Sequence, residues 1–292
     1  MYCRSFAATD TGRRRQVNED SFLRNDELGL YVVADGMGGH AAGEVASRES
    51  VDAIHAMVSG GVDVIAKFNE HPDGIEEARN LCRLLESAVQ SAAFLVFGLA
   101  QQSPSRQGMG TTISALLVVE GFGVTAQVGD SRVYCVREGD VVQMTDDHTL
   151  VNWQVKQGLL TLAEARAIRD HNVITRAVGS HEYVQVDTQI FPVKPGDRFL
   201  LCSDGLHGYL KHAEIPRVMD LGLERAARRF VALANERGGK DNITAVVVDV
   251  AAYGPWEENR PRTRPGPGAE PPPPESPPAA EAGETPCVPY ES

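Results

Sequence analysis

Aspartates at the ends of apolar segments are the residues in this sequence best suited to carry chemistry. Asp35 ends "LYVVAD", Asp130 ends "VTAQVGD", Asp204 ends "RFLLCSD", and Asp241 stands just before "ITAVVV". Asp20, within "NED", precedes another short stretch that is expected to be extended. If these segments are strands of one packed fold, their carboxylates converge at one rim.

Convergence of these carboxylates would be unfavourable without a compensating cation. Like charges in a partly dry site raise one another's pKa or force the site apart. Hard divalent cations with oxygen ligands, Mg²⁺ or Mn²⁺, remove that repulsion. The five cysteines are scattered and form neither a C-x-x-C pair nor a Cys/His cluster, which disfavours zinc and a disulfide framework. The sequence therefore predicts a Mg²⁺ or Mn²⁺ site.

Asp35 by itself also fits two other interpretations, a turn residue and part of a nucleotide-phosphate loop. Gly36, Gly38 and Ala41 satisfy G-x-G-x-x-A between a strand-like and a helical segment. The nucleotide interpretation fails because the strands that follow have short connections and leave no parallel βαβ unit, and no G-K-[ST] follows. A simple Asp-Gly turn stays compatible with Asp35 alone. Only the collected aspartates favour a metal ligand.

The spacing of apolar residues predicts the elements that would position these aspartates. Strand-like runs follow one another closely after residue 110, and connections as short as "EG" and "GD" permit only antiparallel neighbours. Helical periodicity covers 42–57, 81–99 and 223–234, and two short helices are expected within 149–170. This order of elements indicates an α+β layered sandwich built on antiparallel sheets.

The charge balance excludes two classes of partner. The chain has 28 Lys+Arg against 40 Asp+Glu, a net charge of -12, whereas nucleic acids and anionic membranes require a basic face. The N-terminal segment lacks the apolar core of a signal peptide, and we expect no segment to approach the ~20 apolar residues that span a bilayer. With cysteines expected to be reduced, these features predict a cytoplasmic protein.

The composition changes after Tyr253. The last 39 residues carry 12 of the 17 prolines, including "PPPPESPP". Such a segment cannot bury enough apolar surface to offset its ordering entropy, so residues 254–292 are predicted to be a disordered, Pro-rich tail. A proline-rich ligand for a partner domain is the alternative interpretation. The preceding residues, 1–253, are predicted to form a single domain.

Several separated stretches resemble the metal-dependent protein phosphatase family (PPM, the type 2C serine/threonine phosphatases), and its bacterial branch in particular. In family order they are "TDTGRRRQVNED", "VVADGMGGHAAGE", "GMGTT", "VGDSRVY", "LLCSDGL" and "KDNIT". The resemblance covers about residues 1–250. It implies a four-layer α-β-β-α sandwich, two central antiparallel sheets flanked by helix pairs. It also implies a flap subdomain at about 145–178, which either sets substrate choice or is an inert insertion.

The resemblance implies two core metal ions, Mn²⁺ or Mg²⁺, at defined residues. Asp35 would bridge the two ions and the Gly36 carbonyl would bind the second, while Asp204 and Asp241 would complete the first. Asp20 would hold a metal-bound water. Two cations about 3.5–4 Å apart turn a shared water into hydroxide for in-line attack on phosphorus. A glycine lets its own carbonyl approach a metal without interference from a Cβ.

A phosphate ligand and a third metal site follow from the same resemblance. Arg15 would bind the substrate phosphate, because a guanidinium presents a fork of donors and is never deprotonated. Asp130 with Asp204 would form the weaker third-metal site of bacterial relatives. Gly208 stands four positions after Asp204, where the family commonly has an acid. The third site is therefore expected to be weaker still in this chain.

Protonation of the leaving group has two candidates. Met37 occupies the position at which eukaryotic relatives carry a histidine thought to serve as the acid, and bacterial relatives often share this methionine. His40 lies nearby in the sequence and has a pKa suited to the task. Metal-bound water is the alternative donor.

The function that the resemblance implies is hydrolysis of phosphoserine and phosphothreonine in proteins by a metal-bridging hydroxide. Expected partners are phosphorylated proteins, among them a Ser/Thr protein kinase, and a monomer is expected. Two alternatives stay open. One is a phosphatase-like sensing or binding module with weak catalysis, for which Gly208 is the only support. The other is a phosphoesterase that acts on small molecules.

Overall fold

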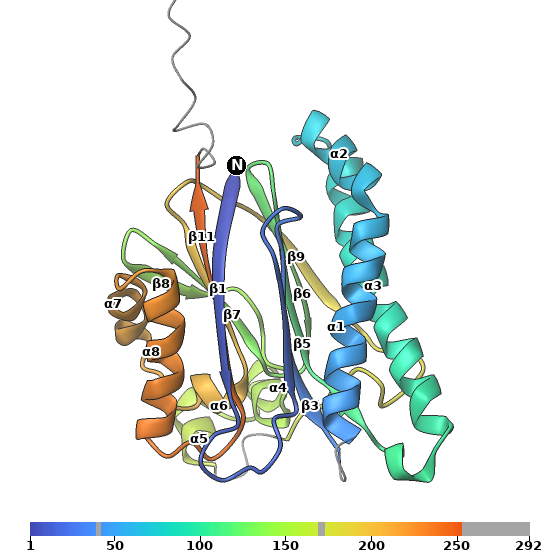
Figure 1. Cartoon of the computed structure of the whole chain (residues 1–292), viewed down its shortest axis with the longest axis vertical. Helices are drawn as coiled ribbons and strands as arrows, with labels where there is room; N and C mark the ends of the chain where they lie inside the picture. The colour runs from blue at the N-terminus through green and yellow to red at the C-terminus, as the bar shows by residue number, and fades with distance from the viewer. Residues whose placement is uncertain (39–41, 169–172, 253–292) are drawn as a thin grey trace, which may run out of the picture. The chain divides into compact units, whose positions relative to one another are not determined.

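Two antiparallel sheets lie face to face at the centre of the protein, with helices on the outer side of each (Figure 1). The computed structural model describes residues 1–38, 42–168 and 173–252. One compact unit spans Met1–Gly254. The expected α+β four-layer α-β-β-α sandwich is confirmed. The predicted tail, 254–292, lies outside the described residues.

The first sheet has the strand order β1-β11-β10-β7-β8. Its strands are β1 (Tyr2–Asp10), β11 (Ile243–Ala251), β10 (Arg198–Cys202), β7 (Arg132–Arg137) and β8 (Asp140–Gln143). The second sheet has the order β2-β3-β5-β6-β9, and a short strand, β4, also pairs with β3. These strands are β2 (Asp20–Asn25), β3 (Leu30–Met37), β4 (Gly110–Thr111), β5 (Ile113–Val119), β6 (Phe122–Val128) and β9 (Asp187–Pro192).

The inner faces of the two sheets share an apolar core. Alternate residues of each strand point to opposite faces, so every second side chain enters the space between the sheets. Tyr31 and Val33 of β3 meet Phe199 and Leu201 of β10 in this core, and all four are fully buried. The neighbouring residues Val32 and Ala34 of β3 are equally buried but face the helices instead. The apolar run before Asp35 is therefore a strand that is covered on both sides.

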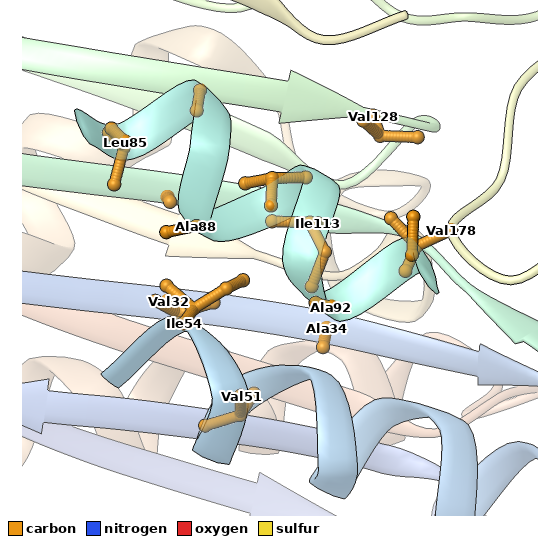
Figure 2. Close-up of a cluster of buried hydrophobic side chains, with 14 of the residues drawn as sticks. Val32, Ala34, Val51, Ile54, Leu85, Ala88, Ala92, Ile113, Val128 and Val178 are labelled. Atoms are coloured by element: carbon orange, nitrogen blue, oxygen red, sulfur yellow. The ribbon is translucent and has the colours of Figure 1, made fainter. Parts of the chain in front are cut away.

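Three helices cover the outer face of the second sheet: α1 (Ala42–Gly60), α2 (Val62–Glu70) and α3 (Ile75–Gln101). Figure 2 shows Ile54 of α1 and Leu85, Ala88 and Ala92 of α3 gathered over Val32 of β3. Small alanines let the helices approach the sheet closely, while the longer side chains fill the remaining space. The predicted stripes at 42–57 and 81–99 thus lie mostly on the buried faces of α1 and α3, although Met57 and Leu95 are exposed.

The helix α3 differs from one expectation. By length and apolar composition it could cross a bilayer, contrary to the expectation that no segment comes close to this threshold. The run "AAFLVFGLA" is only part of this helix, and the residues before it add further apolar content. Its buried residues, Leu81, Leu85, Ala88 and Val96 among them, belong to the core described above. Core helices commonly meet the same criterion.

The outer face of the first sheet is covered by α8 (Leu223–Glu236) and α7 (Ile215–Met219). Ala226, Ala227 and Phe230 of α8 pack against Leu200 and Val247 of the sheet. The remaining helices are short: the 3-10 turns Pro104–Arg106 and His212–Glu214, α4 (Leu150–Lys156), α5 (Leu162–Ala167) and α6 (Asp204–His207). The two short helices expected within 149–170 are α4 and α5.

The connection between β6 and β7 changes sheets. Short links predicted antiparallel neighbours, and β5–β6 and β7–β8 are such pairs. Between β6 and β7, however, the chain turns at Gly129, which has a φ of +96°, and passes from the second sheet to the first. A side chain there would also collide with Thr112, since a Cβ would lie 2.6 Å from its Cγ2. This turn carries Asp130.

Candidate active site

Carboxylates line a cavity of about 260 Å³ at one rim of the sandwich. Four of the five predicted aspartates belong to its wall, as do Arg15 and Gly36, and they come from positions far apart in the chain. They are joined by Glu19, which the sequence analysis did not single out. The acidic residues that line the cavity are Glu19, Asp35, Asp130, Asp204 and Asp241. The predicted convergence of aspartates from separate strand ends is therefore present in the structure.

Asp20 and Asp35 lie opposite each other in the register of β2 and β3. Asp20 is 8% exposed, and its Oδ2 accepts hydrogen bonds from Ser203 Oγ at 2.7 Å and Thr244 Oγ1 at 2.6 Å. Its Oδ1 is buried and has no hydrogen-bond partner among the described residues. Burial, followed by the negative charges of Asp204 and Asp241, raises the pKa of Asp20. An orphaned buried carboxylate oxygen is the kind of group that a bound water or ion satisfies.

The backbone of Asp35 is fixed by two threonines. Its N–H donates to Thr112 Oγ1 at 3.0 Å, and its carbonyl accepts from Thr112 N–H and from Thr111 Oγ1, both at 2.9 Å. Burial raises the pKa of the Asp35 carboxyl well above its ordinary value, and the charges of Asp20 and Asp204 raise it further. This carboxyl is held among other acids by backbone bonds that do not involve its side chain.

Gly36 is required by close backbone packing. A Cβ at this position would lie 2.2 Å from Gly43 O and 2.5 Å from Glu19 O. The Gly36 N–H donates to Glu19 O at 3.1 Å. The family resemblance accounts for this glycine by access of its carbonyl to a metal. The structure adds a second reason, which is that the start of α1 and the segment before β2 leave no space for a side chain.

Asp204 begins the four-residue helix α6, directly after Ser203. The next residue, Gly205, lies so close to β11 that a Cβ would come within 1.9 Å of Asn242 O. Burial, then the negative charge of Asp241, raises the pKa of Asp204. The side chain of Asp204 lies within hydrogen-bonding reach of that of Asp35, and this contact by itself lowers the pKa of Asp204.

Asp130 lies at the turn between the sheets and is 6% exposed. Its pKa is raised to about 7 by burial and by the charges of Asp204 and Asp147, while Arg132 opposes this shift. The turn is held from two sides. His207 Nε2 lies 2.9 Å from Asp130 O, and Gly129 N–H donates to His148 Nδ1 at 3.2 Å. Gly208, near the predicted third-metal position, follows directly after α6.

Arg15 reaches the cavity through an ion pair with Asp241. Its Nη2 donates to Asp241 Oδ2 at 2.8 Å, and this bond is the main reason why the pKa of Arg15 is raised. The side chains of Arg15 and Asp241 remain 50% and 35% exposed. The predicted phosphate ligand therefore lies in the cavity, but it is paired with a predicted metal ligand.

The acidic side chains that the structure describes at this cavity are not arranged as a coordination shell. Among the residues that the structure describes, no three His, Cys, Asp or Glu side chains are placed so as to hold one metal ion. The contacts above explain this, because Asp241 pairs with Arg15, Asp20 with two hydroxyls, and Asp35 with Asp204. The donor set still suits a hard divalent cation, since it consists of carboxylate oxygens that repel one another. A cation would displace the retained protons.

Asn242 positions the loop that carries Arg15, and it was missed by the sequence analysis. Its Nδ2 donates to Thr11 O at 3.0 Å and Val17 O at 2.9 Å, and its Oδ1 accepts from Glu19 N–H at 2.8 Å. Asn242, Ser203, Thr244 and Thr112 all lie within or beside the quoted family stretches. Their positions close to the aspartates in the sequence are the signal that could have identified them. His40, the candidate proton donor, lies outside the described residues.

The predicted flap, 145–178, adjoins the cavity through Ile174, which lines it. The segment contains α4 and α5, and both helices begin at threonines, Thr149 and Thr161, whose side chains accept a backbone hydrogen bond. Leu150 N–H donates to Val173 O at 2.8 Å, which joins the two ends of the flap. Residues 169–172 lie outside the described part of the chain.

Comparison with known proteins gives one family throughout. The model of the family described as protein phosphatase 2C matches residues 9–247. The chain is 36% identical over 259 residues to the serine/threonine protein phosphatase PstP of Mycobacterium tuberculosis. This match covers 87% of the chain but 46% of PstP, so the chain spans just under half the length of that relative.

A second relative is matched over nearly its whole length. Protein phosphatase PhpP of Streptococcus pneumoniae is 34% identical over 248 residues, which cover 83% of this chain and 95% of PhpP. Among solved structures, the catalytic domain of PstP in complex with two manganese ions superposes with a TM-score of 0.72 at 34% identity. That likeness covers 86% of this chain and 99% of the solved one.

Proposed function

This chain belongs to the protein phosphatase 2C family, and on that premise we propose that it is a metal-dependent phosphatase of phosphoserine and phosphothreonine in proteins. The observation that carries the proposal is the convergence of Asp35, Asp204 and Asp241 with Arg15 in one cavity. The relatives PstP and PhpP bear the names of protein phosphatases, which supports the same substrate class.

The metal ligands proposed here are those that the family resemblance implies. Asp35 and the Gly36 carbonyl, with Asp204 and Asp241, hold two Mn²⁺ or Mg²⁺ ions, and Asp20 holds a water at the site. The solved PstP domain contains two manganese ions, which supports this number and this metal. When bound, such ions lower the pKa of water to near neutrality and neutralise charge on the phosphate. The buried acids supply the negative charge that attracts them.

Arg15 orients the phosphate in this proposal. Its fork of donors matches phosphate oxygens. Its partner Asp241 would be one of the residues that hold the metal, which would leave the guanidinium available to the substrate. Asn242 keeps the Arg15 loop against Glu19 and thereby limits where the guanidinium can move. The position of Arg15 at the mouth of an otherwise acidic cavity gives an anionic substrate its point of attachment.

A third ion at Asp130 and Asp204 is also proposed, with weak affinity. Both residues line the cavity, where burial and the negative charge of Asp204 raise the pKa of Asp130. Gly208 supplies no carboxylate where many relatives have one. Proton donation to the leaving group falls to His40 or to a water at the site.

The cellular setting is proposed from sequence features. Substrates are phosphorylated proteins, among them a Ser/Thr protein kinase, and the protein is a cytoplasmic monomer whose catalytic domain ends near residue 253. The net charge of -12 argues against binding to anionic membranes, and the proline-rich composition of residues 254–292 supports the domain boundary. Analytical ultracentrifugation of the full chain tests the oligomeric state, and a truncation after residue 253 tests the domain boundary. Full peptide hydrolysis by the truncated protein is expected.

The test of the proposed activity is release of phosphate from a phosphothreonine peptide by the full chain, with Mn²⁺ and with chelator. Mn²⁺-dependent release is expected, and Asp204→Asn should lower kcat by about a thousandfold, equivalent to several kcal/mol of transition-state stabilisation. Asp63→Asn on the exposed face of α2 is the matched control. Folded protein that binds the peptide by calorimetry without hydrolysing it would instead be a binding module. Hydrolysis of phosphorylated metabolites alone would identify a small-molecule phosphoesterase.

A further inference from the structure

A second cavity, of about 300 Å³, adjoins the acid-lined cavity. The two cavities share two lining residues, Met37 at the end of β3 and Ile174 of the flap. The rest of the second wall comes from the segment between the flap and β9, residues 175–185. A molecule whose phosphate lies in the first cavity therefore has this second cavity directly beside it.

The two cavities differ in chemistry. Five carboxylates line the first, whereas the lining residues of the second include no Asp or Glu. Apolar wall is contributed by Met37, Ile174, Ala177 and Val184. Arg176 also lines it, but its charge is compensated by Asp187, whose Oδ1 accepts from Arg176 Nη1 at 2.6 Å. The second cavity is thus largely apolar and borders an acidic one.

Tyr183 is an exposed aromatic residue at this cavity, and its backbone is fixed. The side chain is 68% exposed, although the neighbouring residue Val184 is buried at 7%. Gln90 of α3 binds both neighbours: its Nε2 donates to Glu182 O at 3.0 Å, and its Oε1 accepts from Val184 N–H at 3.2 Å. A large amphipathic ring that is left open on a fixed segment of backbone is typical of a recognition surface.

We propose that this second cavity is a peptide subsite, which binds an apolar side chain two residues away from the phosphorylated residue of the substrate, with Tyr183 as part of its wall. The proposal rests on the phosphatase function proposed above. Side chains two residues apart in an extended peptide point to the same face and lie about 7 Å apart, so this flanking side chain is delivered beside the phosphate site. The volume of the cavity is at the lower end of the range for small-ligand pockets and is ample for one apolar side chain.

The charges on both sides of the cavity favour an apolar occupant. An acidic side chain would approach the carboxylates of the first cavity and the net charge of -12. A basic side chain would find no carboxylate among the residues that line the second cavity, because Asp187 already binds Arg176. An aliphatic or aromatic side chain needs no ionic partner and can be buried against Met37, Ile174 and Val184. The second cavity thus discriminates among phosphopeptides by the side chain that flanks the phosphorylated residue.

The experiment compares phosphothreonine peptides that differ only at the positions two residues before and two residues after the phosphothreonine, with leucine, serine, aspartate or lysine at both. The full chain with Mn²⁺ should cleave the leucine peptide with a kcat/KM about tenfold above that of the serine peptide, mainly through a lower KM. In Tyr183→Ala this ratio should fall toward one. Tyr183→Phe should keep it, because the ring supplies the contact. Phe94→Ala removes an equally exposed aromatic from α3 and is the control.

Hydrolysis of para-nitrophenyl phosphate by the same preparations reports the phosphatase chemistry separately. Equal cleavage of all four peptides by wild-type protein, or an unchanged preference in Tyr183→Ala, would overturn the subsite while the phosphatase assignment stands. A stronger preference for aspartate or lysine would also overturn it. Failure to hydrolyse both peptides and para-nitrophenyl phosphate would remove the proposed function, and the subsite with it.

Discussion

Arg15 donates a hydrogen bond to Asp241 Oδ2 at 2.8 Å, which joins the proposed phosphate ligand to a proposed metal ligand. Both side chains are partly exposed, at 50% and 35%. Ion pairs of this exposure contribute about 0–1 kcal/mol, so exchange of partners costs little. The pair holds both residues at the mouth of the cavity and leaves each available to its proposed ligand.

Substitution of Arg15 should therefore affect catalysis and leave the fold intact. In Arg15→Lys the charge remains but the fork of donors is lost, so kcat/KM for a phosphothreonine peptide should fall about ten- to a hundredfold. The free energy of unfolding should change by less than about 1 kcal/mol. Steady-state kinetics and urea unfolding measure the two effects. A kinetically normal Arg15→Lys would contradict the assigned role.

Arg13 provides the matched control for Arg15. Its Nε donates to Asn235 O at 2.7 Å, which ties the loop to the end of α8. Arg13→Lys should lower stability with a smaller effect on kcat/KM than Arg15→Lys. If Arg13→Lys lowered kcat/KM more than Arg15→Lys does, Arg13 would be the phosphate ligand.

The stability of the metal-free protein should decrease as pH rises from 4 to 7, and Asp130 should contribute to this. Its pKa in the fold is about 7, above the ordinary value of 3.8. Below pH 4 it is protonated in both states, whereas between these values only the unfolded chain releases the proton, so unfolding becomes easier. The groups that face it are Asp204 and Asp147, which raise the pKa, and Arg132, which lowers it.

Urea unfolding in the presence of chelator measures this dependence at pH 5 and pH 7.5. Each unit by which the folded-state pKa exceeds the ordinary value corresponds to about 1.4 kcal/mol. Asp130→Asn should lose less stability between the two pH values than wild-type protein, and Asp52→Asn on the exposed face of α1 should behave as wild type. Identical slopes for Asp130→Asn and wild type would show that Asp130 does not carry the effect.

The sequence predicted the sandwich and the convergence of aspartates because both depend on local signals. Apolar runs that lead to Asp35, Asp130 and Asp204 mark strands, and these strands bring the aspartates to one cavity, although β3 continues past Asp35 to Met37. The strand β1 and the helix α2 were missed. In β1 only two of nine residues are buried, since the strand lies at the edge of the first sheet, and its sequence lacks a clear alternation.

Contacts that depend on distant segments could not be predicted. The link after β6 is as short as a hairpin, and nothing in "VGDSR" indicates that the next strand joins the other sheet. The pairing of Arg15 with Asp241 joins residues 226 positions apart. The clamp that Asn242 places on the Arg15 loop depends on the same long-range packing. The roles assigned to the site residues, His40 included, stay predictions.

Gly36→Ala should destabilise the fold as well as impair metal binding. The added Cβ would lie 2.2 Å from Gly43 O, a backbone atom that cannot move without shifting the start of α1. Overpacking of this kind commonly costs 1–3 kcal/mol. Gly60→Ala, where no atom lies within 4 Å of the added Cβ, should be neutral or stabilising. Thermal unfolding with chelator separates these outcomes, and equal melting temperatures for both variants would contradict the packing argument.

Asp35→Asn should stabilise the metal-free protein while it abolishes activity. The Asp35 carboxyl is surrounded by Asp20 and Asp204, and ionising it among these charges weakens the fold. An asparagine removes the charge, keeps the shape, and can donate to Asp204, which lies within hydrogen-bonding reach of Asp35. With chelator at pH 8, the melting temperature should rise by about 2–4 °C for each kcal/mol of repulsion removed.

Manganese should reverse the order of the melting temperatures of wild-type protein and Asp35→Asn. A ligand that binds only the folded state stabilises it by mass action, so Mn²⁺ should raise the melting temperature of wild-type protein. Asp35→Asn, which lacks the proposed bridging ligand, should respond much less, and Asp63→Asn should respond as wild type does. The crossing of the two melting temperatures on addition of Mn²⁺ needs no substrate and no turnover. If Asp35→Asn were less stable than wild type with chelator and equally responsive to Mn²⁺, Asp35 would be a structural residue and the metal site would lie elsewhere.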